Sequence, residues 1–342
     1  MKYRKLGSSG LLVSRITLGT MTFGAPDWGC DERESHAIMK KYLNAGGNCL
    51  DCADVYAGGK SEEIIGSFQS QIDRDAVIIA SKCYFPTGSE PNQFGASRKH
   101  IVAACEASLK RLKTDYIDLY YLHAPDPITP LEESLRAYDD LVRQGKVRYL
   151  GCSNIFGWQI AKANGIASAK GLEPMVAGQY IYNLVHRELE RELIPAAVDS
   201  GVGIFCYSPL GGGLLTGKYK GQSEPAKGTR ISFRTQVDGP RFWHPTGFKT
   251  AEVLEQVSAQ TDIPMADLAI AWPLKRRAVT SVIIGARTRD QLEANLKSGD
   301  WDIPEDVWHT LEERTRPEEE YLNWFQRFND KMFYERAEFW NV

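Results

Sequence analysis

Residues 48–56 of the chain read Asn48-Cys49-Leu50-Asp51-Cys52-Ala53-Asp54-Val55-Tyr56. The stretch starts as a short apolar strand that ends at the carboxylate of Asp51, and the phenol of Tyr56 follows in a turn rich in glycine. Two later apolar runs also end in ionisable side chains, Lys82 and His123. In a parallel barrel such strand ends meet on one face, where active sites are built. We therefore predict one catalytic site that contains Asp51, Tyr56, Lys82 and His123.

Outward from this stretch, strand-like and helix-like segments alternate eight times. A hairpin within residues 1–15 is expected to plug the bottom of the barrel. Strands are expected at residues 16–20, 48–52, 77–82, 117–122, 147–152, 175–179, 202–206 and 281–284, and helices at 32–44, 61–69, 97–112, 131–144, 156–167, 188–199, 251–260, 265–276 and 289–296. Alternation of apolar strands with helices predicts a parallel sheet, and eight units predict a closed (β/α)8 TIM barrel of the α/β class. We expect residues 1–342 to form one such domain.

The spacing of Cys49 and Cys52 forms a C-x-x-C pair, which is compatible with a redox or metal site. Residues three apart on a strand point to opposite faces, however, so Cys49 would share the barrel interior with Asp51 while Cys52 faces the helices. The sequence has no second C-x-x-C to complete a zinc site. We therefore expect buried thiols and no metal. The same alternation places Ile78, Ala80 and Lys82, and likewise Leu119, Tyr121 and His123, on the interior face.

Composition restricts the classes of function. The 342 residues are 43% hydrophobic and 25% charged, and their formal net charge of −3 gives no reason to expect nucleic acid or an anionic membrane as a partner. No apolar run approaches the roughly 20 residues that span a bilayer. The first residues lack an apolar leader. Seven cysteines, an odd number spread along the chain, indicate reduced thiols. These features predict a cytoplasmic protein.

Two regions interrupt the regular alternation. Residues 207–248 are rich in glycine and form the long loop expected after the seventh strand, and loops of this length are usually functional or mobile. The tail, residues 317–342, is strongly aromatic and includes Phe339 and Trp340. It either covers the barrel mouth or packs on the flank or on a second subunit. Trp243, His244, Trp324 and Phe325 are the side chains expected to close the mouth in the first case.

The four residues at successive strand ends resemble the catalytic tetrad of the aldo-keto reductase family. The resemblance extends from Tyr3-Arg4-Lys5-Leu6-Gly7 to Leu292-Glu293-Ala294-Asn295-Leu296. It implies reversible reduction of an aldehyde or ketone to the alcohol. Tyr56 would donate the proton, Lys82 would lower the pKa of the phenol, Asp51 would orient Lys82, and His123 would orient the substrate carbonyl.

The hydride must come from a cofactor, because no side chain donates one. The chain has no G-x-G-x-x-G after its first strand, so a Rossmann site is not indicated. The family lays NADPH across the barrel mouth instead. Its carboxamide contacts resemble Ser153, Asn154 and Gln179, its stacking position corresponds to Tyr207, and Arg287 matches its 2′-phosphate contact. The full set that the resemblance implies is Gly19, Thr20, Met21, Asp51, Ser153, Asn154, Gln179, Tyr207, Ser208, Pro209, Leu210, Gly211, Gly212, Lys218, Arg230, Gly285, Arg287, Gln291 and Asn295.

Two departures from known patterns bear on the cofactor. Ala294 stands where relatives often carry a glutamate, which leaves the strength of the NADPH preference open. Residues 212–218 nearly match a P-loop, but Tyr219 replaces the hydroxyl residue that binds Mg²⁺, which disfavours a nucleoside triphosphatase. The same loop can wrap a pyrophosphate through backbone N–H groups and Lys218.

Within the family, the chain resembles the branch of the voltage-gated potassium channel β subunits and bacterial NADPH-dependent reductases. The shared motifs are Ser97-Arg98-Lys99-His100-Ile101, Pro125-Asp126-Pro127, Ser208-Pro209-Leu210 and Gly217-Lys218-Tyr219. The alternative function is therefore a cofactor-binding regulatory subunit of a potassium channel. The presence of His123 and the lack of an N-terminal docking extension favour an enzyme, acting as a monomer or homo-oligomer on a small carbonyl substrate. Mycotoxin ketones, sugar aldehydes and lipid-derived aldehydes all remain compatible with an aromatic mouth.

Overall fold

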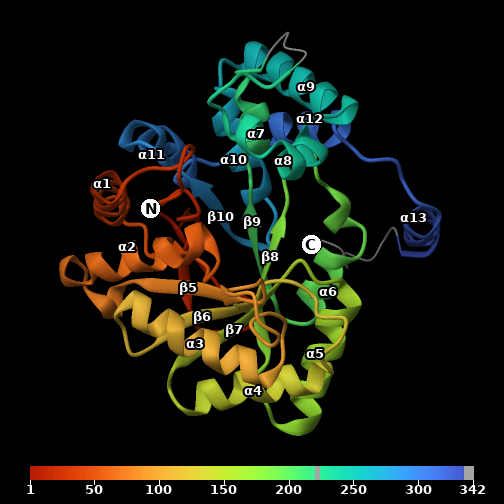
Figure 1. The fold of residues 1–342 in the computed structure, drawn as a ribbon. Coiled ribbons are helices and arrows are strands. Elements are labelled where there is room, and N and C mark those ends of the chain that lie inside the picture. Colours follow the sequence, from red (N-terminus) through yellow and green to blue (C-terminus); the bar gives the residue numbers. More distant parts are fainter. Residues whose placement is uncertain (220–223, 335–342) are drawn as a thin grey trace.

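Eight parallel strands close into a barrel in the computed structural model, which describes residues 1–219 and 224–334 (Figure 1). The strands are β3 Ile16–Gly19, β4 Cys49–Asp51, β5 Ile78–Cys83, β6 Ile117–Leu122, β7 Val147–Ser153, β8 Met175–Ile181, β9 Gly203–Tyr207 and β10 Val279–Gly285. Each pairs in parallel with the next, and β10 pairs with β3 to close the ring. The predicted (β/α)8 barrel is confirmed, and every strand bound lies within two residues of its predicted position.

Helices surround the barrel. They are α1 Glu32–Asn44, α2 Lys60–Phe68, α3 Arg98–Leu112, α4 Leu131–Arg143, α5 Gly157–Lys170, α6 Leu193–Asp199, α9 Pro245–Thr261, α10 Met265–Leu274 and α11 Arg289–Leu296. The helix predicted at 188–199 is shorter, because residues Glu188–Glu190 form a separate 3-10 turn. Sequence reasoning missed α12, Glu305–Arg314, although Pro304 and an acidic first turn mark its start.

The N-terminal hairpin closes the bottom of the barrel. Strands β1, Tyr3–Lys5, and β2, Leu12–Ser14, pair antiparallel. Leu6 and Val13 are fully buried in the cluster of side chains that fills the barrel, together with Ile78 and Leu119. The hairpin therefore excludes water from the end of the barrel opposite the predicted site.

The two faces of the strands carry the side chains that alternation predicts. Cys49 lies in the interior cluster with Ala80 and Tyr121, whereas Cys52 belongs to the larger core between strands and helices. All seven cysteines are free thiols, and all except Cys30 are buried. Burial raises the pKa of the Cys152 thiol to about 12, so it is unreactive. The prediction of opposite faces for Cys49 and Cys52 is confirmed.

The long segment after β9 is more ordered than its glycine content suggests. It contains a 3-10 helix, Gly211–Thr216, then α7, Arg230–Phe233, and α8, Thr235–Phe242. The ring of Trp243 packs edge-on against Tyr219 and Phe248, and His244 caps α9 by accepting a hydrogen bond from the N–H of Gly247. Neither side chain is among the residues that line the cavity at the carboxyl ends of the strands, so nothing in the described part of this segment supports their closing the mouth.

The tail forms helix α13, Tyr321–Tyr334, on the flank of the barrel (Figure 1). The side chain of Asn323 donates to the carbonyl of Arg191, and Arg191 forms an ion pair with Glu320. Trp324 and Phe325 stay about half exposed, so these two side chains do not cover the mouth. Of the open alternatives, the described part of the tail follows the flank, while Phe339 and Trp340 lie outside the described residues.

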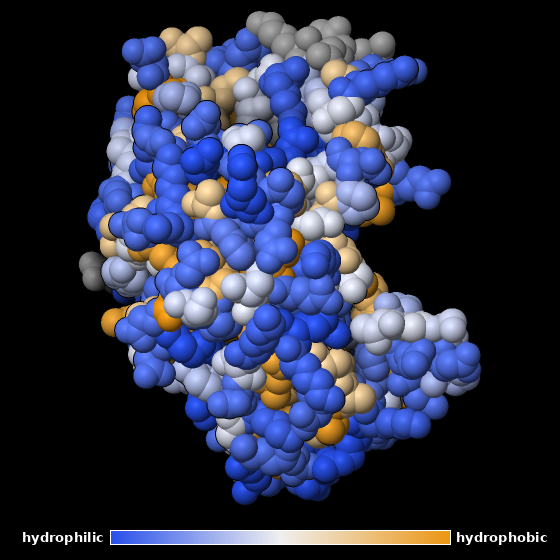
Figure 2. All heavy atoms as spheres, turned by 60° about the vertical axis from the view of Figure 1, so that its left-hand side comes forward, coloured by the Kyte–Doolittle hydropathy of each residue, from blue (hydrophilic) through white to orange (hydrophobic). Residues whose placement is uncertain are grey.

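The outer surface of the protein is mainly hydrophilic on the face shown in Figure 2, with apolar side chains scattered singly or in small groups. Among the described residues, no helix combines the length and apolarity needed to cross a bilayer.

Helix α2, which follows the Tyr56 loop, packs closely against the end of α3, and a pair of glycines tests this contact. A Cβ at Gly66 would lie 2.0 Å from the carbonyl oxygen of Arg111, whereas a Cβ at Gly165 in the exposed part of α5 would meet nothing within 4 Å. We predict that Gly66→Ala lowers the free energy of unfolding by about 1 to 3 kcal/mol. Gly165→Ala should raise it by up to about 1 kcal/mol through helix propensity. Urea unfolding measures both, and equal effects of the two substitutions would contradict the packing argument.

Candidate active site

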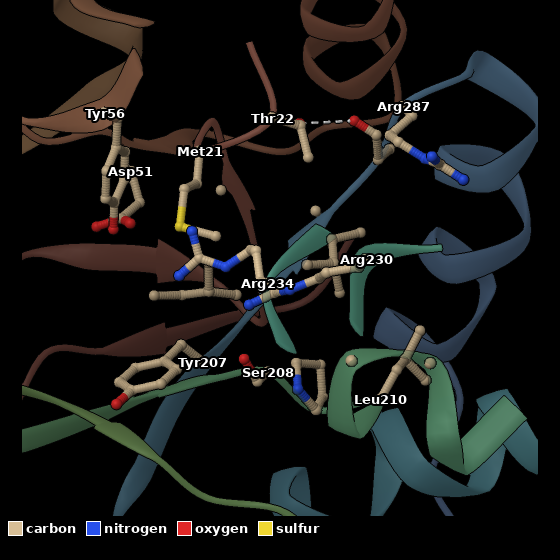
Figure 3. A pocket seen from close by; sticks show the side chains of 18 of the residues that line it. Met21, Thr22, Asp51, Tyr56, Tyr207, Ser208, Leu210, Arg230, Arg234 and Arg287 are labelled. Atoms are coloured by element: carbon tan, nitrogen blue, oxygen red, sulfur yellow. Dashed lines mark hydrogen bonds between the residues drawn. The ribbon is translucent and has the colours of Figure 1, made fainter. Parts of the chain in front are cut away.

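A cavity of about 820 Å³ opens at the carboxyl ends of the barrel strands. It is lined by residues that follow seven of the eight strands, by Gln179 within β8, and by residues of α7, α8 and α11 (Figure 3). Asp51, Tyr56 and His123 all face it. Lys82 does not reach the surface of the cavity, because its side chain is fully buried beneath Tyr56. Three of the four predicted catalytic residues therefore line the cavity, and the fourth contacts two of them.

The ammonium group of Lys82 holds this centre together. Its Nζ donates to Asp51 Oδ2 at 2.8 Å, to the carbonyl of Cys52 at 2.7 Å and to the Tyr56 hydroxyl at 3.2 Å. An ammonium has three N–H donors, so every donor of Lys82 has an acceptor. Adjacent strands position the pair, since Asp51 lies opposite Ala80 in the register of β4 and β5.

A strained turn brings Tyr56 over Lys82. Tyr56 begins a 3-10 turn in which Ala57, Gly58 and Gly59 all have positive φ, at 50°, 64° and 92°. Alanine is uncommon in this left-handed region, and such strain is found at functional sites held by their surroundings. The N–H of Asp54 donates to the carbonyl of Lys82, which ties the start of the turn to β5. The turn thus aims the phenol of Tyr56 back at the ammonium, beside Asp51 (Figure 3).

Burial and charge act against each other at this centre. Burial alone would lower the pKa of Lys82, but Asp51 and Tyr56 outweigh it and raise that pKa, so the ammonium stays charged. For Tyr56, burial raises the pKa of the phenol, and the opposing effect of Lys82 is smaller. Lys82 lowers the pKa of the phenol as predicted, but burial outweighs this effect and the net shift is upward. The phenol is therefore protonated at neutral pH.

His123 stands beside the phenol as a neutral ring. Its imidazole lies edge-on to Tyr56, with ring centroids 6.0 Å apart, and against Phe85 at 4.8 Å. Burial, and to a smaller extent Lys82, lowers the pKa of His123 well below its usual value. Its Nδ1 is buried and has no hydrogen-bond partner among the described residues. A neutral imidazole in this position can hydrogen-bond to an uncharged substrate oxygen.

A polar network continues from this centre along the ends of β7 to β9. The amide of Gln179 donates to Asp51 Oδ1 at 2.7 Å, and the Tyr207 hydroxyl donates to Asn154 Oδ1 at 2.9 Å. Asn154 in turn donates to Ser153 Oγ at 2.9 Å. Asn154 and Ser208 both have positive φ, at 58° and 57°, which turns the chain at the cavity edge.

The other end of the cavity suits an anionic ligand. Gly285, Arg287, Gln291 and Asn295 line it from the end of β10 and from α11. Burial lowers the pKa of Lys218, and the nearby cations Arg287 and Arg230 lower it further. Three cations that raise one another's energy form a site that a bound anion would stabilise.

The backbone in this part of the cavity is shaped to approach a ligand closely. Gly212 and Gly213 have positive φ, and a Cβ on Gly213 would lie 2.4 Å from Lys218 Nζ. Gly212, Gly213 and Lys218 all line the cavity. Glycine N–H groups beside a lysine are a common arrangement around phosphates. Together with the aromatic ring of Tyr207 and the amides at the tetrad end, these residues fit a dinucleotide.

Two of the residues predicted to bind a cofactor do not line the cavity. The hydroxyl of Thr20 is buried and hydrogen-bonded to Ser61 Oγ at 2.7 Å, and Gly211 begins the 3-10 helix, packed against Leu215 and Phe242. All the other members of that predicted set do. Gly213, Thr216 and Ala294 also line the cavity, and the sequence connects their segments with the cofactor although they are outside the predicted set. Sequence reasoning missed further lining residues, which are Thr22, Trp28, Val55, Ala57, Phe85, Arg234, Val237, Arg241, Ile283, Ile284 and Ala286. Several of these residues immediately follow predicted strands, and this position is the feature of the sequence from which their place at the cavity could have been predicted.

No cluster of three or more histidine, cysteine, aspartate or glutamate side chains in the described parts of the chain is arranged to hold a metal ion.

Comparison with known proteins supports the resemblance seen in the sequence. The model of the aldo/keto reductase family matches residues 15–315. The chain is 34% identical over 320 residues to versiconal hemiacetal acetate reductase of Aspergillus parasiticus, covering 87% of this chain and 92% of the relative. It is 36% identical over 323 residues to an uncharacterized oxidoreductase of Bacillus subtilis (91% and 95%). It is 35% identical over 311 residues to a probable voltage-gated potassium channel subunit beta of Oryza sativa (88% and 92%).

Asp54 is a buried carboxyl group near the tetrad. Its side chain is 3% exposed, and neither oxygen has a hydrogen-bond partner among the residues described. Burial, and next the negative charge of Glu62, raises its pKa to about 7, although Arg111 opposes this. The raised pKa implies that the protein is stabilised when Asp54 is protonated.

We predict that Asp54→Asn removes a loss of stability that the wild-type protein shows as the pH rises. In the unfolded chain an aspartate titrates near pKa ~3.9, whereas in the folded protein Asp54 titrates at about 7. The folded state binds more protons between these values, so its free energy of unfolding falls through this window and stays lower above it. The substitution should raise that free energy at pH 8 by about 1 to 3 kcal/mol. Urea unfolding at pH 5 and pH 8 measures the effect.

Glu63→Gln is the control for this experiment, because Glu63 is an acid on the neighbouring helix α2 whose side chain is half exposed. It should leave the pH dependence unchanged. If Asp54→Asn and the wild type lose the same stability between pH 5 and pH 8, Asp54 does not titrate as described.

Proposed function

The chain belongs to the aldo/keto reductase family, and from this premise we propose that it is an NADPH-dependent oxidoreductase that reversibly reduces an aldehyde or ketone to the alcohol. The observation that carries the proposal is the Lys82 ammonium, buried between the carboxylate of Asp51 and the hydroxyl of Tyr56 at the floor of the cavity. This arrangement keeps a protonated phenol next to a fixed positive charge, as a proton donor to a carbonyl oxygen requires.

Each residue of the centre has a distinct task. Tyr56 donates its hydroxyl proton to the substrate oxygen, and Lys82 stabilises the phenolate that this leaves. Asp51 balances the charge of Lys82 and fixes its orientation. His123, held neutral, hydrogen-bonds to the substrate oxygen and positions the carbonyl carbon. In the oxidation direction, the phenolate of Tyr56 takes the proton from the alcohol. A bound reduced nicotinamide would supply the hydride.

The proposed cofactor is supported by the two ends of the cavity. Ser153, Asn154 and Gln179 offer amide and hydroxyl groups at the tetrad end, where a nicotinamide carboxamide would bind, and Tyr207 offers a ring face. Lys218 and Arg230 offer positive charge to a pyrophosphate. Arg287, whose guanidinium can bind a phosphate bidentately, would contact the 2′-phosphate that distinguishes NADPH from NADH.

The alternative is a cofactor-binding regulatory subunit of a potassium channel. It is supported by the similarity to the Oryza sativa β subunit. The two functions differ in turnover: an enzyme oxidises NADPH steadily when an aldehyde is added, and a purely regulatory subunit does not. A panel of aromatic, aliphatic and sugar aldehydes with NADPH therefore separates them.

We predict that Tyr56→Phe lowers kcat for aldehyde reduction by about 100-fold or more, because the proton donor is lost. NADPH affinity, measured by fluorescence titration, should change little, since the hydroxyl contacts Lys82 rather than the proposed cofactor residues. Tyr321→Phe in the exposed helix α13 is the matched control and should retain full turnover. Near-normal turnover of Tyr56→Phe would reject Tyr56 as the acid.

We predict that Arg287→Ala weakens NADPH far more than NADH, because only NADPH carries the 2′-phosphate. A charge-assisted bidentate contact is worth about 1.5 to 3 kcal/mol, or roughly 10-fold to 150-fold in Kd. Titration of each cofactor into the wild type and the variant measures this. Equal losses for both cofactors would assign the 2′-phosphate to another cation, such as Arg289, Lys218 or Arg230.

A further inference from the structure

Three arginines on the wall of the cavity share one carboxylate. Arg230 and Arg234 each point Nε at Asp238 Oδ2, at 2.8 and 3.3 Å, and Arg241 approaches Oδ1 only to 3.7 Å. Asp238 is fully buried behind them, while the three arginine side chains are 28% to 40% exposed. All three arginines line the cavity, and Figure 3 shows Arg230 and Arg234 extending into it. One carboxylate cannot neutralise three cations, so this wall keeps excess positive charge.

Arg241 is the least engaged of the three. Its contact with Asp238 is longer than a hydrogen bond, and Asp238 Oδ1 has no hydrogen-bond partner among the residues described. Its backbone is nevertheless firmly placed, because its carbonyl accepts from Nε2 of His186 at 2.7 Å and from Nε2 of His244 at 3.0 Å. A guanidinium on a fixed backbone with available donors is prepared to bind an anion.

Arg230 connects two sets of cations in the cavity. Lys218 is influenced by Arg287 and Arg230 but not by Arg241. Arg241 and, to a smaller extent, Arg230 act on Tyr207, whose hydroxyl contacts Asn154 at the tetrad end. Arg234 stacks over the ring of Trp28, 5.4 Å from its centroid, and both side chains line the cavity. Arg234 and Arg241 therefore contact groups other than Lys218.

Apolar side chains surround the same end of the cavity. Trp28, Val55, Phe85 and Val237 line it together with Asp51, Tyr56 and His123. A substrate bound there meets aromatic and aliphatic surfaces around its body and a guanidinium pair at the wall. Arginine binds carboxylates through two parallel hydrogen bonds, which a neutral group of the same size cannot form.

We propose that Arg234 and Arg241 form an anion subsite and that the preferred substrates are aromatic or otherwise apolar aldehydes or ketones that carry a carboxylate. The inference rests on the proposed reductase function and names the substrate class of the same site. In this binding mode the substrate carboxylate contacts the guanidinium groups of Arg234 and Arg241, while the substrate carbonyl reaches Tyr56 and His123.

The test compares 4-carboxybenzaldehyde with its neutral methyl ester, methyl 4-formylbenzoate, in NADPH oxidation by the full-length protein. We expect kcat/KM to favour the carboxylate by about 10-fold to 100-fold, the range of a charge-assisted hydrogen bond. Arg241→Gln and Arg234→Gln should each bring this ratio toward one, mainly through KM, and Arg241→Lys should lose part of it. NADPH affinity of the glutamine variants should stay within about 3-fold of wild type. Arg33→Gln, an exposed arginine on α1, is the control and should keep the ratio.

Three outcomes would overturn the inference. The wild type could reduce both aldehydes equally well, the ratio could survive both glutamine substitutions, or those substitutions could weaken NADPH as strongly as they weaken the substrate. The last would make Arg234 and Arg241 part of the phosphate site. If neither aldehyde is reduced, the reductase proposal fails, and the subsite is judged by calorimetry alone. Terephthalate should then bind the NADPH-loaded protein at least 10-fold more tightly than dimethyl terephthalate, and equal binding would reject the subsite.

Discussion

The buried ammonium of Lys82 is the constraint on which the site depends. A lone charge in a protein interior is strongly unfavourable, and it is tolerated only when paired and fully hydrogen-bonded. Here the carboxylate of Asp51, the carbonyl of Cys52 and the hydroxyl of Tyr56 accept its three protons. Removing any one acceptor would leave a buried donor unpaired. These acceptors are held in place by the register of β4 and β5 and by the left-handed turn after Asp54. A change in either would therefore disturb the hydrogen bonds of the Lys82 ammonium.

This dependence explains which parts of the site could be read from the sequence. Strand alternation identifies Asp51, Lys82 and His123 because period-two patterns assign a face to each side chain, and the barrel gathers the strand ends. The pKa of Tyr56 could not be predicted in the same way. Its direction is a balance between burial and the charge of Lys82, and the depth of burial depends on the surrounding loops. The structure shows that burial is the larger effect.

The wall residues were missed for a related reason. Arg234 and Arg241 lie in a segment whose glycines predict a loop, whereas residues 230–233 and 235–242 are helical. No periodic pattern over four to eight residues fixes which side of so short a helix faces a cavity. Trp28 and Phe85 follow strands β3 and β5, so the sequence predicts that they lie at the carboxyl end of the barrel. Whether each ring points into the cavity depends on tertiary packing, which the sequence does not show.

The wall also has a core separate from that of the barrel. Leu214, Tyr219, Ile231 and Phe242 form their own buried cluster, and Trp243 and Phe248 pack against it. The barrel interior is filled by a different cluster, closed below by Leu6 and Val13. Side chains on the wall can therefore change without disturbing the strands that hold Lys82 and Asp51. Under the proposed function, the barrel would fix the reaction, whereas a segment with its own core would set the charge that meets the substrate.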